Sequence, residues 1–188
     1  AGAIDVAGGL HIDGKIDVLG GACNSCHGSA ANPAPPQSVM GATETTDMGV
    51  GAHQAHLTDG ALRVALPCDA CHTVPGTTDA PGHLDAAPAE LTWGTLATVG
   101  DQAPSWDRAA DTCSSTWCHG SGLTGGTNTA PRWTVVGAGQ ATCGTCHGAP
   151  PPAPHPAATE CRLCHPGTMT EEGGIDVAGG LHINGEID

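Results

Sequence analysis

The 188-residue chain lacks most of the large side chains with which a domain of this size builds a core. It contains no phenylalanine and no tyrosine, and its aromatic residues are Trp93, Trp106, Trp117 and Trp133. Small and turn-forming residues are abundant instead, with 29 glycines and 15 prolines. Such a chain cannot readily offset its conformational entropy by burying its own apolar surface. We therefore expect a large apolar group from outside the polypeptide to complete the core.

Basic residues are scarce, with 5 lysines and arginines against 19 acidic residues and a formal net charge of −14. This balance excludes nucleic acid as a partner, because nucleic acid selects basic surfaces. It predicts a soluble, secreted surface. No apolar run reaches membrane-spanning length, so we expect no membrane span. No export signal is visible at Ala1, and we expect a mature or excerpted chain.

All ten cysteines occur in pairs, and each pair is followed directly by a histidine. Four pairs have the form C-x-x-C-H and one has the form C-x4-C-H. This spacing is typical of c-type heme attachment, in which two thiols add to the vinyl groups of one porphyrin and the next residue binds the iron. The sequence thus predicts five heme c groups. The attachment cysteines are Cys23 and Cys26, Cys68 and Cys71, Cys113 and Cys118, Cys143 and Cys146, and Cys161 and Cys164; the proximal ligands are His27, His72, His119, His147 and His165.

Two other classes of site use paired cysteines. C-x-x-C pairs hold structural zinc, and an exported chain with ten cysteines can form a disulfide framework. Neither class explains why a histidine follows every pair or why no cysteine is left over. Heme attachment explains both.

Six histidines remain beyond the five attachment motifs: His11, His53, His56, His83, His155 and His182. Met40, Met48 and Met169 are alternative axial ligands, but the number of spare histidines favours histidine. One of the six is accounted for by a repeat, because residues 4–17 recur as residues 175–188 with two differences. One 171-residue period then holds ten histidines for five irons, which predicts two histidines on every iron.

The repeat also sets the expected domain organisation. Residues 1–171 form one five-heme unit, and residues 172–188 either begin the next unit or form a terminal hairpin that contacts a neighbouring unit. The chain is then one unit of a longer tandem array or a subunit of a filament. In both versions His182, or equivalently His11, binds a heme across the unit boundary. The alternative is a coincidental pair of terminal hairpins in a monomer.

The expected fold is mostly coil with short helices and a few short β-hairpins around a core of stacked hemes. Segments 28–46, 73–90 and 120–131 read as loops, and residues 148–158 as extended chain. Residues 51–57 predict a helical turn with His53 and His56 on one face. Single helical turns are expected at the attachment sites. Asp13-Gly14, Asp59-Gly60 and Asn184-Gly185 predict two-residue β-hairpins that present a histidine from a short strand.

With these motifs the chain resembles the extracellular multiheme c-type cytochromes of dissimilatory metal-reducing bacteria, which alternate C-x4-C-H and C-x-x-C-H sites. The matching stretches are residues 51–60, 68–75, 82–85, 113–120, 143–151, 161–168 and 182–188. The resemblance implies display outside the cell, long-range electron transfer and assembly into heme-lined filaments. It also implies that His53, His56, His83 and His155 are distal ligands.

We therefore expect an electron carrier and not an enzyme. Two imidazoles on each iron leave no position for a substrate, and histidine ligation with negative charge nearby favours a low reduction potential. Expected partners are copies of the chain itself and redox proteins or acceptors outside the cytoplasm. The rival function is a multiheme reductase with one open axial position. Lys15 is the only lysine, which gives little support to a lysine-ligated catalytic heme.

Overall fold

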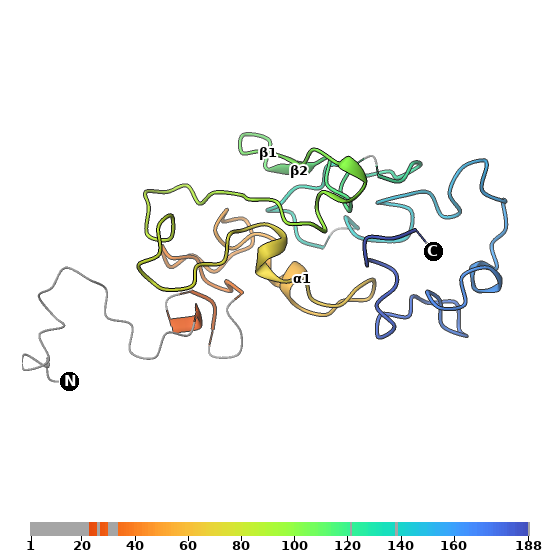
Figure 1. Ribbon diagram of the computed structural model, residues 1–188, viewed down its shortest axis with the longest axis horizontal. Coiled ribbons are helices and arrows are strands. Elements are labelled where there is room, and N and C mark those ends of the chain that lie inside the picture. The colour runs from red at the N-terminus through yellow and green to blue at the C-terminus, as the bar shows by residue number, and fades with distance from the viewer. Residues whose placement is uncertain (1–22, 26, 30–33, 121, 138, 188) are drawn as a thin grey trace, which may run out of the picture.

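The computed structural model describes residues 23–25, 27–29, 34–120, 122–137 and 139–187. Cys26, His11 and the predicted hairpin at Asp13-Gly14 lie outside the described residues. The described chain runs along one long axis, with residues 34–50 toward one end and residues 150–170 at the other (Figure 1). The attachment segments are therefore spread along the length of the molecule.

Regular structure is sparse, which confirms the prediction of a mostly coiled chain. The described elements are, in order, η2 (Cys23–Ser25), α1 (His53–Leu57), η3 (Cys68–Ala70), η4 (Val99–Asp101), β1 (Ser105–Asp107), β2 (Thr112–Ser114) and η5 (Cys161–Leu163). No described residue of segments 73–90 and 120–131 lies in a helix or strand, as predicted. Residues 148–158 are less extended than expected, because the His155 N–H donates to the Pro152 carbonyl and closes a turn.

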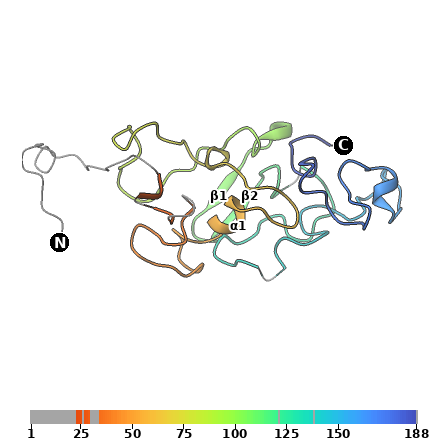
Figure 2. The same ribbon diagram turned by 90° about the horizontal axis from the view of Figure 1, so that it is seen from below.

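Strands β1 and β2 form an antiparallel pair in which Trp106 lies opposite Cys113. The hydroxyls of Ser105 and Ser114 hydrogen-bond across the pair at 2.9 Å. Both views of the molecule place α1 and these strands near the middle of the long axis (Figures 1 and 2). The small sheet thus carries the first cysteine of the C-x4-C-H motif to the centre of the molecule.

The hairpins predicted at Asp59-Gly60 and Asn184-Gly185 are not β-structure, and these predictions were wrong. The Asp59 carboxylate accepts the Ala65 N–H at 2.7 Å, and the Asn184 side chain accepts the Glu186 N–H at 2.8 Å. These short polar side chains hydrogen-bond to nearby backbone in place of a strand partner. The helical turn predicted over 51–57 is confirmed as α1, and it presents His56 from a helix.

The described residues contain only a small apolar core. Its buried apolar members are Ala34, Val50, Ala70 and Ala97, and no large side chain is fully buried among them. Several larger apolar side chains are exposed, including Met40 at 90% and Leu163 at 79%. A core this thin agrees with the expectation that a bulky apolar group completes the packing.

No helix in the described part of the chain is long and apolar enough to cross a membrane.

Candidate functional site

Three of the C-x-x-C-H motifs begin with a single helical turn, as predicted: η2, η3 and η5. In η3 the Cys71 and His72 N–H groups both donate to the Cys68 carbonyl, at 3.2 and 3.0 Å. In η5 the His165 N–H donates to the Cys161 carbonyl at 2.9 Å. One turn of chain therefore gathers two thiols and the following imidazole, as attachment to one porphyrin edge requires.

The other two attachment segments depart from the predicted helical turn. Residues 143–147 form a tight turn in which the Thr145 N–H donates to the Thr142 carbonyl at 3.0 Å. The C-x4-C-H segment starts on strand β2, and its turn is closed by the His119 N–H, which donates to the Thr116 hydroxyl at 2.7 Å. Two additional residues between the cysteines let the chain leave a strand and turn before it reaches the histidine.

The clearest feature of the site is a set of paired imidazoles. Four histidines that follow a cysteine pair each face a second histidine: His72 faces His53, His119 faces His56, His147 faces His182 and His165 faces His155. The ring centroids in these pairs are 6.3, 5.9, 6.2 and 6.2 Å apart, respectively. His27 and His83 are the described histidines outside these four pairs.

This separation fits one metal ion between two imidazoles. A metal–nitrogen bond to imidazole is about 2.0 Å, and the ring centre lies about 1.1 Å behind the nitrogen, so two rings on opposite sides of one ion have centroids about 6.2 Å apart. Aromatic rings in direct contact also have centroids about 4.5–7 Å apart, so it is the attachment-motif histidine in each pair that points to heme. The four pairs are therefore spaced as axial ligand pairs, and these residues fit heme iron.

Hydrogen bonds fix the tautomer of most histidines. In seven of them Nδ1 lies 2.7–2.9 Å from a backbone carbonyl oxygen: His53, His56, His72, His83, His147, His155 and His182. A carbonyl oxygen only accepts, so the proton lies on Nδ1 and the Nε2 lone pair is available. Metal-binding histidines are commonly oriented by this kind of bond.

The histidines in the centre of the molecule are kept neutral. Burial lowers the pKa of His53 and of His56. Burial also lowers the pKa of His119 to about 4, and the neighbouring His56 and Arg63 lower it further. Neutral imidazole is the form that binds a metal, so these rings are ready to do so at neutral pH. The buried Nδ1 atom of His119 has no hydrogen-bond partner within the described structure.

The nine described cysteines show neither a disulfide framework nor a zinc-like cluster. None of the nine described cysteines is in a disulfide. Burial raises the pKa of Cys113 and of Cys118 to about 11. Across the described residues, no three His, Cys, Asp or Glu side chains converge in a way that could hold a metal ion. A structural zinc site needs four such ligands around one point, whereas axial ligation of heme needs two.

Trp133, which the sequence did not single out as a site residue, lies against helix α1. The Trp133 ring lies 4.7 Å from the His53 ring and 5.6 Å from the His56 ring, measured between centroids. The Trp133 Nε1–H donates to the Met48 carbonyl at 2.9 Å, across 85 residues of chain. No motif marks Trp133, and its only signal in the sequence is that aromatic residues are rare.

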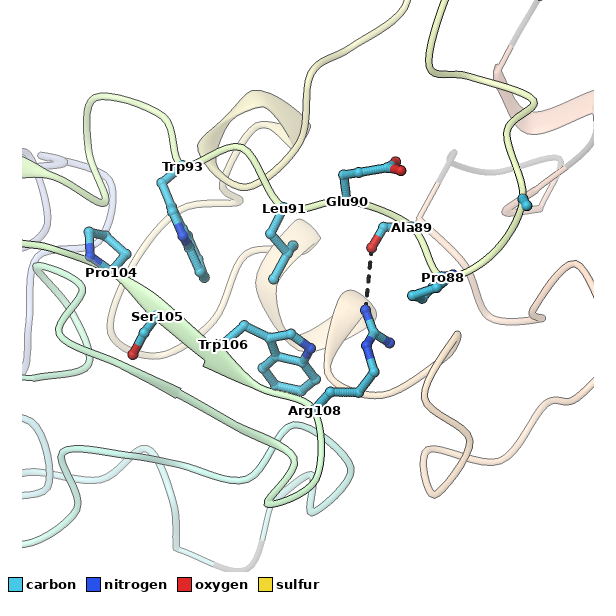
Figure 3. A pocket seen from close by; sticks show the side chains of 10 residues that line it. Pro88, Ala89, Glu90, Leu91, Trp93, Pro104, Ser105, Trp106 and Arg108 are labelled. Carbon is cyan, nitrogen blue, oxygen red and sulfur yellow. Dashed lines mark hydrogen bonds between the residues drawn. The ribbon is translucent and has the colours of Figure 1, made fainter.

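A shallow, open cleft of about 580 Å³ lies beside the centre. The side chains of Trp93, Leu91 and Trp106 point toward one another across it, and Arg108 donates to the Ala89 carbonyl at 3.4 Å (Figure 3). None of the paired histidines lines this cleft. It adjoins the His53–His72 pair, because Glu90 lines it and the Glu90 carbonyl accepts from His72 Nδ1 at 2.9 Å.

Comparison with known proteins supports the motif assignment. Residues 112–147 match a family model described as the Geobacter CxxxxCH...CXXCH motif. The matched segment contains the C-x4-C-H site at 113–119 and the C-x-x-C-H site at 143–147, which confirms the resemblance to multiheme c-type cytochromes with mixed motifs. The match indicates heme c attachment, electron transfer by a multiheme cytochrome and export from the cytoplasm. No curated protein and no solved structure matches the chain.

Proposed function

We propose that this chain is an extracellular electron carrier with five covalently attached c-type hemes, each bound by two histidines. The observation that carries the proposal is the set of four imidazole pairs with centroids 5.9–6.3 Å apart. Each pair joins the histidine of an attachment motif to a histidine from elsewhere in the chain. Such pairs have the composition and spacing expected of two axial ligands on one iron.

Heme, when bound, supplies one-electron iron chemistry. The residues of the chain hold and orient it. The cysteines of each motif anchor one porphyrin edge, the following histidine approaches one face, and its partner approaches the other. Two imidazoles close both axial positions to small molecules, which favours an electron carrier over a reductase.

The fifth heme belongs to the first attachment motif, in which His27 follows Cys23 and Cys26. We propose that its second ligand is one of the remaining histidines, His11 or His83. One 171-residue period then holds ten histidines for five hemes.

The same count supports a continuous array of units. His182 lies beyond residue 171, in the repeated segment, and its ring lies 6.2 Å from that of His147 inside the unit. In an array, His11 would serve the corresponding heme of the preceding copy. We therefore propose tandem repeats or a filament in which a histidine of one unit binds a heme of the next, with other redox proteins or extracellular acceptors at the ends.

Intact mass of the purified exported protein, measured under denaturing conditions, tests the cofactor assignment. We expect the polypeptide mass plus five hemes per 171-residue unit. A mass without heme, or with zinc recovered in its place, would overturn the proposal. Double variants with both cysteines of one motif changed to alanine should each lose one heme.

Electron microscopy of the native material separates the forms of assembly. Filaments that dissociate into single units in denaturant indicate a non-covalent polymer, and a polypeptide of several units indicates tandem repeats. Dispersed single units under all conditions would overturn both forms and leave the five-heme assignment standing.

A further inference from the structure

The two histidines of α1 belong to different pairs with different ring geometry. The ring planes of His53 and His72 are inclined by only 23°, whereas those of His56 and His119 are inclined by 81°. Residues three positions apart lie on the same side of a helix, and both rings donate from Nδ1 to a backbone carbonyl at 2.9 Å, His53 to Val50 and His56 to Ala52. A neighbour outside the helix adds a further restraint on both rings.

Trp133 contacts both rings, each in its own way. Its indole meets the His53 ring edge to face, at 86° and 4.7 Å. The same indole lies nearly parallel to the His56 ring, at 27° and 5.6 Å. Rotation of either imidazole about its Cβ–Cγ bond would drive it into the indole or break the contact. One rigid ring therefore restricts the orientation of two ligands.

Trp133 is itself fixed from two sides. Its Nε1–H donates to the Met48 carbonyl at 2.9 Å, just before α1. Its backbone N–H donates to the Asp111 carbonyl at 2.7 Å, two residues before Cys113 on the strand that leads to His119. Trp133 thus links the segment that holds one ligand of the His56–His119 pair to the segment that holds the other.

The approach of the indole depends on a glycine. Gly51 has φ +41°, and a Cβ placed on it would lie 1.9 Å from Trp133 Nε1. Any other residue at this position would collide with the indole and also take up a backbone conformation that is costly for it. Glycine at position 51 therefore leaves room for the Trp133 indole against α1.

We propose that Trp133 is a positioning residue that sets the ring orientation of His53 and His56, and so the angle between the two axial ligands at each of two irons. This inference rests on the proposed bis-histidine ligation. Trp133 is then one determinant of the difference between a near-parallel and a near-perpendicular ligand pair at neighbouring hemes.

The angle between axial imidazoles has a direct spectroscopic consequence. Near-parallel rings split the two iron d orbitals that interact with the ligand π systems, and a ferric low-spin iron then gives a rhombic electron paramagnetic resonance (EPR) signal. Near-perpendicular rings leave these orbitals almost degenerate, and the signal has a large maximum g value. The His56–His119 and His147–His182 pairs, at 81° and 65°, should give the second type.

EPR spectra of the oxidised Trp133→Ala variant, with all hemes attached, test the proposal. We expect the large-g signal to fall, because the His56–His119 pair loses its restraint and the His147–His182 pair does not. Trp133→Phe should restore much of that signal, since a phenyl ring can still stack on His56. Val39→Ala is the control, because Val39 is 80% exposed, and it should leave the spectrum unchanged.

The outcomes separate this proposal from the broader one. If the wild type shows low-spin heme and Trp133→Ala leaves both signal types unchanged, Trp133 does not position the ligands. If the wild type shows no low-spin heme, the ligation itself is wrong. If Trp133→Ala yields no heme-loaded protein, Trp133→Leu decides, because leucine keeps an apolar side chain without a flat ring. A reduced large-g signal in this variant supports the proposal, and a wild-type spectrum contradicts it.

Discussion

The centre of the molecule and its C-terminal arm use the same ligands in different surroundings. In the centre, made of α1, η3, β2 and Trp133, the pKa values of His53, His56 and His119 are lowered by burial. In the arm, residues 143–187, the thiols of η5 are exposed and Leu163 between them is 79% exposed. The attachment motif therefore fixes the ligand chemistry but not the environment of the site.

The centre and the part of the arm around η5 also differ in what holds their histidines. His155 Nδ1 donates to the carbonyl of the very next residue, at 2.7 Å, so its position is set locally. Trp133 restrains His53 and His56 through contacts that span about 80 residues of chain. The fold of the centre should thus depend on its attached hemes more than the fold around η5 does.

The largest expected difference comes from removing one attachment site in each region. Cys113→Ala with Cys118→Ala should lower the free energy of unfolding by at least about 3 kcal/mol, the cost of losing a large core group. Cys161→Ala with Cys164→Ala should cost less than about 1 kcal/mol. Denaturant unfolding followed by tryptophan fluorescence measures both. Equal losses would remove the distinction between the two regions.

A single methyl group at Gly51 should destabilise the centre next most strongly. Gly51→Ala places a Cβ against Trp133 and forces alanine into a positive φ, for an expected loss of about 2–4 kcal/mol. Gly76→Ala is the matched control, because no atom lies within 4 Å of the added methyl. It should change the free energy of unfolding by less than about 0.5 kcal/mol. A stable Gly51→Ala protein would mean that Trp133 does not occupy this space.

Arg63 should contribute through hydrogen bonds at the end of α1. Its guanidinium donates to the His56 and Val64 carbonyls, both at 2.7 Å, and to the Ala55 carbonyl. Arg63→Met leaves these carbonyls without that donor and should cost about 1–2 kcal/mol in thermal or denaturant unfolding. Arg63→Lys keeps the charge but not the planar guanidinium, so its free energy of unfolding should lie between those of the wild type and Arg63→Met. A loss as large for Lys as for Met would mean that the charge contributes nothing.

An arginine in the arm should matter least. Arg162 pairs with Glu171 at 2.9 Å, but the two side chains are 47% and 83% exposed. Exposed ion pairs contribute little, so Arg162→Met should change the free energy of unfolding by less than about 0.5 kcal/mol. The same measurement at low and high salt should differ little. A loss equal to that of Arg63→Met would show that the arm is packed as firmly as the centre.

The sequence predicted what depends on local spacing. Cysteine spacing located the attachment segments, and helical spacing located His53 and His56 on α1. The sequence did not predict which histidines pair, because the contacts involved join distant parts of the chain. His182 donates to the Leu62 carbonyl 120 residues away, and Trp133 donates to the Met48 carbonyl across 85 residues. Spacing carries no information on such contacts. The hairpin predictions failed because Asp59 and Asn184 bond to their own local backbone.

Quantitative low-temperature EPR of the fully oxidised wild-type chain tests the central claim most directly. Bis-histidine ligation predicts that all iron is low-spin, with rhombic and large-g signals both present and none of the iron high-spin. A high-spin ferric signal equivalent to one iron per chain would contradict this account and identify an open axial position, as a reductase requires.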